Sequence, residues 1–455
     1  MVNQFLLRNF RVVYSVSHWT RRRFTRAGQL LLVAIVATGV LGIDTDLTRA
    51  YQFFSLLAAL IIVAIVSGVF FRARFRVRRQ LPAFGTVSDT ITYRITVENC
   101  SSKTQRDLVF SENVEAKFPS CTEFQRIRQP GEEKQNWLDR VVGYRRWAWQ
   151  MRLRRGVDIS EYPLASLSAA TETELSVTVT PLRRGYIRFI GAIIARPDPF
   201  GLFRAFARVV TQDALLVLPR RYPVPDIQLP GSRRYQQGGV ALASSVGDAQ
   251  EFFALRDYRQ GDPLRHIHWR SWARRGEPIV KQYQDEYFVR HALILDTFMD
   301  TVEHPVFEEA VSVAASFTCS IQQQDTLLDL MFVGTEAYRF TTGRSLSSID
   351  SMMEVLACVQ PCIDKPFADL QQLVTRHASQ LSGAICILLA WDETRQDFVK
   401  TLRNMGIPML VIVVEDAAFE AEPDPGPMAD QPQHFYRLTT GHIEEGLAAL
   451  RTEES

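Results

Sequence analysis

Two stretches without a charged residue lie near the start of this 455-residue chain, at 27–43 and 51–71. A helix needs about 17 residues to span the hydrocarbon core of a bilayer, so the first stretch just reaches that length and the second exceeds it. Because cationic flanks stay on the cytoplasmic side of a membrane, the sequence predicts a two-helix transmembrane hairpin with both ends inside. The flanking arginines are Arg21, Arg22, Arg23, Arg26, Arg72, Arg74, Arg76, Arg78 and Arg79.

A cleaved signal peptide is the alternative for 27–43, because its apolar core is short, but no clear small-residue cleavage site follows it. Under both interpretations the arginines after residue 71 keep the rest of the chain inside. We therefore expect a multi-pass protein of the inner (plasma) membrane, with the lipid bilayer as a partner and with both termini and the soluble domains in the cytoplasm. The segment 1–26 is expected to be cytoplasmic, and residues 1–20 within it form either a helix along the inner leaflet or a flexible terminus. The hairpin and its basic flank occupy 27–80.

The region 81–220 shows the alternation of apolar and polar residues that is typical of half-buried strands. In 90–98 every second residue is apolar, and 175–180 repeats the pattern. Several such short segments separated by turn residues predict an immunoglobulin-like β-sandwich. The following segment, 221–250, is rich in proline and glycine and is expected to be a linker.

Arginine and tryptophan alternate with other residues in 145–154. This pattern favours a half-buried strand over a lipid or nucleic-acid site, although the outward arginines are close enough in sequence to the membrane to touch lipid headgroups. The formal net charge of the chain is only +2. Since a polyanion needs a clear surplus of positive charge, we do not expect nucleic acid as a partner.

The last region, 287–455, alternates strand-like and helix-like segments. Such alternation predicts a doubly wound, Rossmann-like sheet, in which ligands bind beyond the carboxyl ends of the strands. The whole chain is thus expected to be a multi-domain α+β protein. We expect strands at 291–296, 327–333, 384–390 and 409–414, helices at 305–323, 346–359, 367–379 and 394–405, and a final strand and helix up to 451.

Between the linker and this region, 251–286 is dense in arginine, aromatic residues and histidine. Seven basic residues stand against six acidic ones, a mixture that suits internal salt bridges or a protein interface better than a polyanion site. His266 and His268 face the same way on a strand, but the spacing implies no third metal ligand. Trp269 and Trp272 are expected to be packing anchors.

Three motifs follow one another along the chain: RGY at 184–186, DPFGLF at 198–203, and LRDYRQGDPLRHIHW with ARRG within 255–276. Together they resemble the domain of unknown function 58 family, and the resemblance covers nearly the whole chain. It implies a C-terminal domain of von Willebrand factor A type, a bacterial or archaeal source, and a MoxR-type AAA+ ATPase as partner. The signature positions expected to contact a partner are Arg256, Tyr258, Gly261, Asp262, Arg265, His268, Trp269, Arg274 and Gly276.

The resemblance also implies a metal site after the first strand of the last region. In von Willebrand factor A domains this site begins Asp-x-Ser-x-Ser, whereas here the segment is Asp-Thr-Phe-Met-Asp. Asp296 matches, Phe298 replaces one serine and cannot bind a metal, and Asp300 replaces the other. Asp392 matches the later aspartate of the family site. The three aspartates would form a degenerate site for Mg²⁺ or another divalent cation; alternatively, Asp296 and Asp392 cap helices and bond loops.

Two functions follow as expectations. The first is a membrane-anchored, non-catalytic scaffold or adaptor that binds protein partners through its von Willebrand factor A-like domain and works with a MoxR-type AAA+ ATPase. It fits the cytoplasmic placement and the lack of a nucleophile–base pair in the sequence. The second is a divalent-metal-dependent hydrolase that uses Asp296, Asp300 and Asp392, with Arg344 or Arg395 as a positive clamp on a phosphoryl group.

Overall fold

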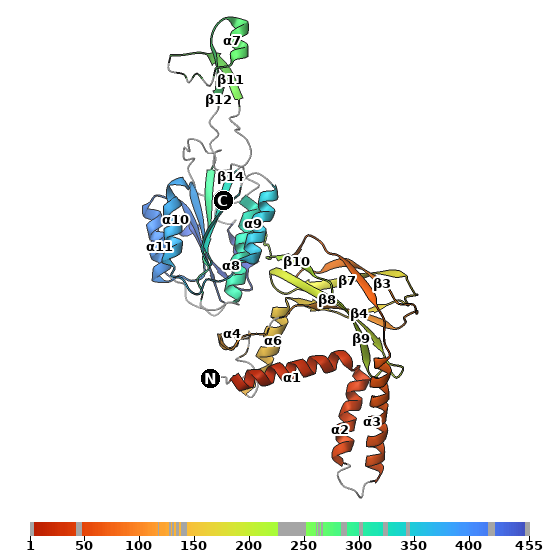
Figure 1. Ribbon diagram of the computed structural model, residues 1–455. Coiled ribbons are helices and arrows are strands. Elements are labelled where there is room, and N and C mark those ends of the chain that lie inside the picture. The colour runs from red at the N-terminus through yellow and green to blue at the C-terminus, as the bar shows by residue number, and fades with distance from the viewer. Residues whose placement is uncertain are drawn as a thin grey trace. The chain divides into compact units, whose positions relative to one another are not determined.

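The structure is a computed structural model that forms a mixed α+β protein with helices and several sheets, in agreement with the predicted α+β class. Contacts divide the chain into two compact units, one made mainly of residues up to 220 and the other mainly of later residues, and each is described by itself (Figure 1). The residues described are 4–41, 48–116, 118–126, 129, 132, 136–137, 143–225, 252–260, 262, 264, 267–283, 289–299, 304–321, 326–342, 346–416 and 424–450.

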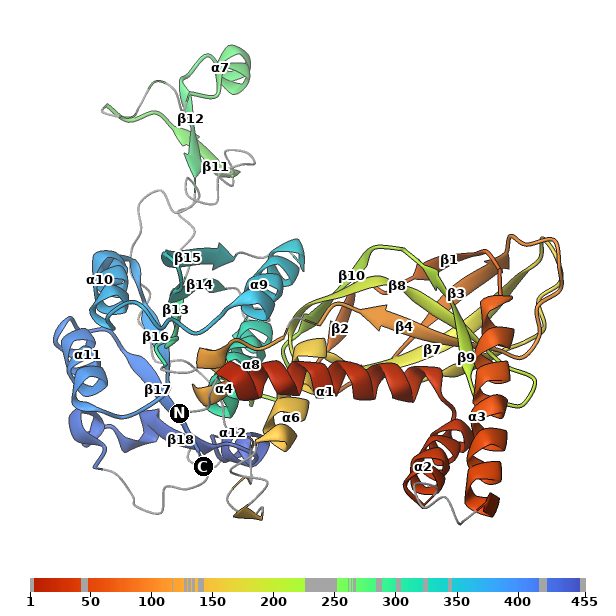
Figure 2. The ribbon, with the colours of Figure 1, turned by 60° about the horizontal axis from the view of Figure 1, so that its bottom comes forward.

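The first unit begins with three helices, α1 (Gln4–Arg23), α2 (Arg26–Leu41) and α3 (Thr48–Val69). In the described part of the chain, one helix is long and apolar enough to cross a membrane, the segment Arg49–Val69 within α3. Helix α2 is apolar but shorter. The two helices lie side by side in both views (Figures 1 and 2), so apolar helices do occur at both predicted positions.

Helix α1 packs through one face onto two later helical segments of the first unit, Cys121–Arg126 and Tyr144–Arg155. Leu7 and Phe10 are buried there, and the Phe10 and Trp147 ring centroids lie 6.0 Å apart. Residues 4–23 therefore form a helix held by packing, which excludes a flexible terminus for this segment. The other face keeps an apolar stripe exposed, as the alternative of a helix along a membrane surface requires; it consists of Val12, Val13, Val16 and Trp19.

The DPFGLF motif forms a turn at 198–203 that we call the latch, because it holds the base of α2 and α3. The Asp198 carboxylate accepts hydrogen bonds from three backbone amides of the turn, at 2.6, 2.6 and 2.9 Å, as aspartate commonly does in turns. The latch places the Phe203 ring 5.2 Å from the Phe24 ring, between their centroids. The buried cluster at this contact is completed by Ile61, Ala64 and Leu202.

Gly28 of α2 makes a close approach to the latch, because a Cβ atom there would lie 2.1 Å from the Leu202 carbonyl oxygen. We expect Gly28→Ala to push α2 away from the latch and to destabilise the first unit by about 1–3 kcal/mol. Thermal unfolding of the full chain in detergent, followed by circular dichroism, measures this loss. Gly39→Ala is the matched control, since its Cβ would meet the Phe54 side chain at an ordinary 3.4 Å. Equal melting temperatures of the two variants would contradict the conclusion that the contact between Gly28 and the latch stabilises the first unit.

Strands β1 to β10 follow and form two sheets. The first sheet has the order β1-β3-β7-β5 and the second β2-β10-β8-β4-β6, with β9 paired to β8. Apolar side chains of both sheets share one core, which confirms the predicted β-rich region. The bounds are β1 (Phe75–Gln80), β2 (Phe84–Thr86), β3 (Ile91–Asn99), β4 (Leu108–Val114), β5 (Val157–Ile159), β6 (Tyr162–Leu164), β7 (Glu172–Pro181), β8 (Gly185–Pro197), β9 (Arg204–Val209) and β10 (Asp213–Leu218).

A buried ionic network crosses this core. The side chains of Arg79 and Glu112 are both fully buried, and the Arg79 Nη2 and Nε atoms lie 2.7 and 3.0 Å from the carboxylate oxygens. The Arg79 Nη1 atom also donates to Asp213 at 2.7 Å, and the Tyr93 hydroxyl donates to Glu112 at 2.8 Å. Burial, and then Glu112, raise the pKa of Tyr93, which keeps it a hydrogen-bond donor. The network therefore links strands of both sheets.

The structure corrects the strand predicted at 145–154, because this segment is helix α6 (Tyr144–Arg155), which follows the short helix α4 (Cys121–Arg126). Gly143 and Gly156 flank α6 with φ of 72° and 74°, a conformation that favours glycine and ends helices. The order of tryptophan and arginine in this segment fits a helix as well as a strand. Packing of one helix face under α1 stabilises the helix. The buried residues have the i, i+3, i+4 spacing of a helix face: Trp147, Gln150 and Met151.

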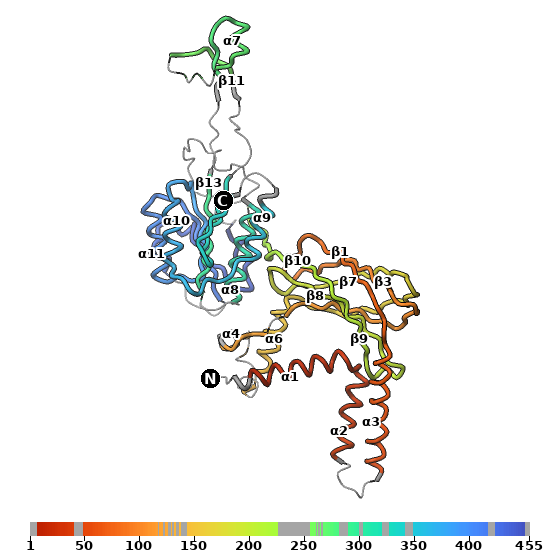
Figure 3. The backbone as a smooth tube through the Cα atoms, viewed as in Figure 1, coloured from red at the N-terminus to blue at the C-terminus, as the bar shows by residue number. Residues whose placement is uncertain are grey.

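The second unit begins with a two-stranded antiparallel hairpin, which we call the signature hairpin. It consists of β11 (Phe252–Asp257), helix α7 (Trp269–Arg275) and β12 (Ile279–Tyr283). Figure 3 shows the backbone of β11 and α7 in this hairpin.

The rest of the second unit is built on a six-stranded sheet with the order β15-β14-β13-β16-β17-β18. Neighbours are parallel except β15, which is antiparallel to β14 and was not predicted. Helices α10 and α11 cover one face, and α8, α9 and α12 lie on the other (Figure 2). The bounds are β13 (Val289–Leu295), α8 (Pro305–Ile321), β14 (Thr326–Val333), β15 (Ala337–Thr342), α9 (Leu346–Cys358), α10 (Ala368–His377), β16 (Gly383–Leu388), α11 (Glu393–Asn404), β17 (Met409–Glu415), β18 (Phe435–Thr439) and α12 (Ile443–Ala449).

Candidate functional site

The strand order places the switch point of the six-stranded sheet between β13 and β16. From β13 the chain runs through α8 to β14 on one side, and from β16 it runs through α11 to β17 on the other. Ligands of such sheets bind beyond the carboxyl ends of the strands at this point. Asp296 directly follows β13, and Asp392 lies four residues after β16. The structure thus brings together two of the three predicted carboxylates, while Asp300 lies outside the described residues.

Asp296 is completely buried, and both of its carboxylate oxygens accept hydrogen bonds. The Oδ1 atom accepts from the Phe298 amide at 2.9 Å, and Oδ2 accepts from the Leu389 amide at 3.1 Å. The Arg395 Nε atom also donates to Oδ2, at 2.6 Å. These bonds fix Asp296 between the ends of the two central strands.

Arg395, in the first turn of α11, lies between the two carboxylates. Asp392 is the N-cap of this helix, and its Oδ1 accepts from the Arg395 amide at 2.9 Å. The Arg395 Nη1 atom donates to the Asp392 Oδ2 at 2.5 Å, and Nη2 donates to the Phe298 carbonyl at 3.3 Å. The guanidinium carbon lies 5.1 Å from the centroid of the Phe367 ring. The planar guanidinium therefore uses all three nitrogens in one orientation.

At this cluster, neighbouring charges and burial shift the pKa values of Asp296 and Arg395 in opposite directions. Burial raises the pKa of Asp296, while Arg395 and the two backbone amides oppose that rise. Burial lowers the pKa of Arg395, but Asp296 and Asp392 outweigh it and raise that pKa above its ordinary value. Arg395 is therefore a permanent cation between two carboxylates.

A divalent cation held by Asp296 and Asp392 would need the space between their carboxylates, which the Arg395 guanidinium fills. The neighbouring Thr297 hydroxyl is also occupied, because it donates to the Val333 carbonyl at 2.5 Å. Within the described ranges, no group of three or more His, Cys, Asp or Glu side chains could hold a metal ion. The described residues thus form a salt-bridged cluster, and the metal site that includes Asp300 stays a prediction.

The ion pair of Arg256 and Asp262 closes the loop after β11 in the signature hairpin. The Arg256 Nη1 and Nη2 atoms each lie 2.7 Å from a carboxylate oxygen, and the Arg259 amide donates to Asp262 at 2.9 Å. Arg256, followed by the Arg259 amide, lowers the pKa of Asp262 to about 2. Asp262 therefore remains ionised at neutral pH, and the predicted internal salt bridge is present here.

Helix α7 and its preceding loop present apolar side chains to solvent. The Trp269 and Trp272 rings stack with centroids 5.2 Å apart, yet Trp269 is 63% exposed and Leu264 is 68% exposed. The prediction of a packing anchor is therefore wrong for Trp269, because the hairpin is too small to cover both rings. The residues that do close the hairpin from inside are Ile267, Ile279 and Val280.

The other signature positions shape the hairpin. Tyr258 and His268 bond through their backbone amides to carbonyls at the start of the β12 side, at 2.9 and 2.8 Å. The His268 Nδ1 atom lies 2.6 Å from the Ser271 hydroxyl. Gly276 ends α7 with a φ of 77°, and Arg274 is exposed. Two more signature positions, Gly261 and Arg265, lie outside the described residues, as does His266.

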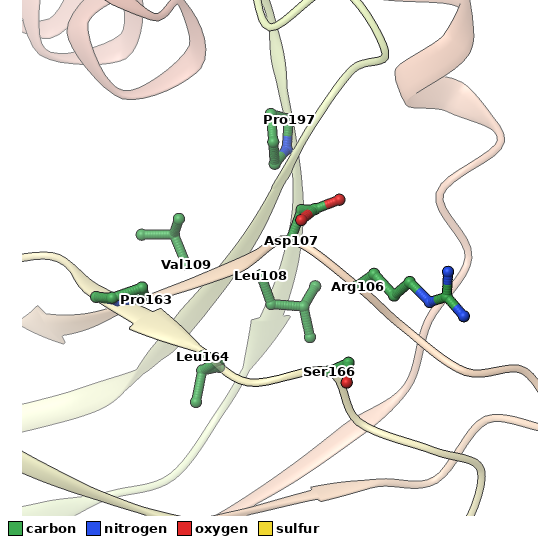
Figure 4. Close-up of a pocket in the computed structure, with 8 residues that line it drawn as sticks. All are labelled: Arg106, Asp107, Leu108, Val109, Pro163, Leu164, Ser166 and Pro197. Atoms are coloured by element: carbon green, nitrogen blue, oxygen red, sulfur yellow. The ribbon is translucent and has the colours of Figure 1, made fainter.

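A hollow of about 530 Å³ lies beside β4 and β6 in the first unit. Figure 4 shows apolar side chains on its wall and the Arg106 side chain extended away from Val109 and Pro163. Its polar lining residues are Arg106, Asp107 and Ser166.

Comparisons with known proteins fit the resemblance found in the sequence. Residues 254–431 match the family described as "Protein of unknown function DUF58". The uncharacterized protein YeaD of Bacillus subtilis (strain 168) is 26% identical over 185 residues, which cover 40% of this chain and 45% of YeaD. The chain thus matches less than half the length of that relative.

Similarity to solved structures is low. The CARDB domain of the PF1109 protein from Pyrococcus furiosus is 12% identical and covers 33% of this chain and 91% of that chain, with a TM-score of 0.19. A β-glucosidase from Listeria innocua is 10% identical and covers 32% of this chain and 16% of that chain, with a TM-score of 0.16. At such TM-scores neither structure supports an argument about fold or function.

The matched region contains most of the signature hairpin and the switch point with Asp296, Asp392 and Arg395. The resemblance seen in the motifs is therefore confirmed for part of the chain: residues 254–431 match the model of the DUF58 family of proteins of unknown function.

Proposed function

We propose that this protein is a membrane-anchored, non-catalytic scaffold that binds protein partners on its cytoplasmic side and works with a MoxR-type AAA+ ATPase. In this proposal α2 and α3 cross the inner membrane as a hairpin, and both termini are cytoplasmic. The two sheets of the first unit form an immunoglobulin-like sandwich, and the sheet β13–β18 is a domain of von Willebrand factor A type. The signature hairpin and the second unit supply the binding surface.

The position of Arg395 carries this proposal. Its guanidinium bridges Asp296 and Asp392 and so supplies permanently the positive charge that a divalent cation would supply reversibly. A site closed by its own cation offers no open coordination position for a substrate, which catalysis by a metal requires. The arrangement therefore favours a scaffold over the alternative of a divalent-metal-dependent hydrolase that uses Asp296, Asp300 and Asp392.

The surface of the signature hairpin supports protein binding. Exposed Trp269 and Leu264 lie beside three exposed arginines of α7. Tryptophan and arginine are the residues that most often dominate the energy of protein interfaces. An acidic surface with an apolar pocket fits this combination on a partner. The exposed arginines are Arg270, Arg274 and Arg275.

The test is recovery of partners from detergent-solubilised membranes with the full chain as bait. We expect wild type to recover an AAA+ ATPase and the double variant Trp269→Ala, Leu264→Ala to lose at least about tenfold of it, since each side chain contributes on the order of 1–2 kcal/mol at an interface centre. Met405→Ala, an exposed apolar residue at the end of α11 (39% exposed), is the matched control. Recovery of no ATPase by wild type, or equal recovery by the double variant, would count against the proposal.

A further inference from the structure

A cavity of about 410 Å³ lies in the first unit, between α1 and the sheet that contains β4, β8 and β9. Figure 1 shows α1 passing beside α6 and β9, the elements that complete its wall. The lining residues combine arginines with aromatic rings, and those that matter most are Tyr14, Trp19, Arg22, Arg155, Phe206 and Arg208.

The three arginines of this cavity come from three elements, Arg22 from α1, Arg155 from α6 and Arg208 from β9. Arg155 donates to the Tyr14 hydroxyl at 3.1 Å, which is a neutral partner. In the part of the chain that the structure describes, the side chains of Arg22 and Arg208 make no hydrogen bond or ion pair. Cations gathered in this way ordinarily need anions to offset their repulsion and desolvation.

The nearby carboxylates are occupied by other arginines. Glu115 lines the cavity but lies 3.9 Å from Arg188 on the surface. Glu161 bonds Arg204 through both oxygens, at 2.9 and 2.8 Å. Glu161 still attracts Arg22, but in the lining three arginines stand against the one carboxylate of Glu115, which leaves a surplus of positive charge.

The directions of the pKa shifts of two lining groups agree with this surplus. Burial, followed by Arg22 and Arg155, lowers the pKa of His18 to about 4. Burial, followed by Arg155, also lowers the pKa of Arg22. These cationic groups thus disfavour one another's charged forms, and an anion placed among them would be stabilised by all of them.

Part of the cavity wall is apolar, and the cavity lies close to the base of α2 and α3. Arg22 is two residues before Phe24, which packs on Phe203 of the latch. Trp19 lines the cavity close to the start of α2, and tryptophan at such a position is typical of a membrane–water interface. The apolar wall is formed by Trp19, Phe118, Ile190, Ile193 and Phe206.

We propose that this cavity binds a phosphate-bearing amphiphile, with its phosphate on Arg22, Arg155 and Arg208 and its apolar part along the aromatic wall. Phosphate is the preferred anion because its oxygens accept hydrogen bonds from several guanidinium groups at once. The same chemistry occurs in an anionic phospholipid headgroup and in free phosphate. The apolar wall and the neighbouring apolar helices favour the lipid.

The test uses the full chain in a non-ionic detergent and three probes: short-chain phosphatidylglycerol, phosphatidylcholine of the same chain length, and inorganic phosphate. We expect phosphatidylglycerol to bind at least about tenfold more tightly than either of the others, and the double variant Arg22→Gln, Arg208→Gln to lose about tenfold or more of that affinity. The exposed pair Arg94→Gln, Arg106→Gln is the matched control and should bind like wild type.

Thermal unfolding checks that each variant is folded, and the single variant Arg208→Gln serves if the double variant is not. Equal affinity for the anionic and zwitterionic lipids, or no loss in either arginine variant, would overturn the proposal. Inorganic phosphate that binds as tightly as phosphatidylglycerol would overturn the assignment to a lipid.

Discussion

Arg395→Met is expected to lower the free energy of unfolding of the second unit by about 3–5 kcal/mol at neutral pH, because it leaves the fully buried Asp296 without its cation. Asp296 keeps its two backbone donors, but these carry no net charge to balance it. Methionine preserves an apolar side chain beside the Phe367 ring, so the loss reports the missing charge more than a cavity. Hydrogen exchange of the β13 and β16 peptides in the full chain measures this loss of stability locally.

The size of this loss should depend on pH with a definite sign. Burial already raises the pKa of Asp296, and removing Arg395 takes away a group that opposes the rise. A carboxyl group with a raised folded-state pKa loses stability as the pH rises from its ordinary pKa of about 4 through the folded-state value. The deficit of Arg395→Met should therefore be largest at neutral pH and should shrink as the pH falls toward about 4.

Two further variants separate charge from packing. Arg403→Met breaks an exposed pair with Asp430, in which the side chains are 28% and 65% exposed, and should leave protection of β13 and β16 close to wild type. Adding Asp296→Asn to Arg395→Met removes the buried charge and should recover part of the loss. A deficit that does not change with pH, or a double variant no better than the single one, would contradict the ion-pair interpretation.

Arg79→Met should have an effect of the same order, about 3–5 kcal/mol, in the first unit. Glu112 would be left as a fully buried carboxylate that accepts from the Tyr93 hydroxyl but has no cation, and the Gly191 carbonyl would lose its 2.7 Å bond. Because the network joins both sheets, we expect hydrogen exchange to accelerate in β3 and β4 together.

Arg76→Met is the control for this prediction. Arg76 lies on β1 like Arg79 and pairs with Glu98 of β3 at 3.0 Å, but the side chains are 59% and 28% exposed, so the change should stay within about 1 kcal/mol. Similar exchange rates in the Arg76 and Arg79 variants would show that burial of an ion pair does not determine its contribution to stability in this unit.

The second unit was predicted well because its strands are buried on both faces. Strands such as β13 and β17 read as short continuous apolar runs, and amphipathic helices separate them. Strand β15 (Ala337–Thr342) was missed because it is an antiparallel edge strand whose polar and exposed residues resemble a loop. Helix α6 was predicted wrongly because its apolar residues fit both the two-residue repeat of a strand and the 3.6-residue repeat of a helix. Its packing under α1 distinguishes the two structures.

The candidate site was predicted in part. Asp296 and Asp392 could be placed together because residues that follow neighbouring parallel strands gather at one edge of a sheet. The role of Arg395 depends on where α11 begins, since Asp392 must be its N-cap for the guanidinium to turn back between the carboxylates. Asp392 favours a helix start at this point, but the bond from Arg395 to Asp296 joins residues 99 positions apart, which the sequence alone does not bring together.

Arg79 shows the same limit in the first unit. In the sequence it is the last of a row of arginines that flank an apolar segment, and nothing nearby distinguishes it from Arg78. In the structure the Arg78 side chain is 64% exposed and the Arg79 side chain is fully buried. The difference arises because alternate residues of β1 face opposite sides of the sheet, and the inner side at this position meets Glu112.

The attachment of the sheets to the helices has a mechanical consequence. Only five residues, 70–74, separate the end of α3 from β1, and the latch grips the base of α2 and α3 a second time. With a single attachment the sheets could rotate about the connection, whereas two attachments couple the orientation of the sheets to that of the helices. A torque on the β-sheets is therefore transmitted to α2 and α3 as a change of tilt, and a change of tilt in the helices turns the sheets in the same way.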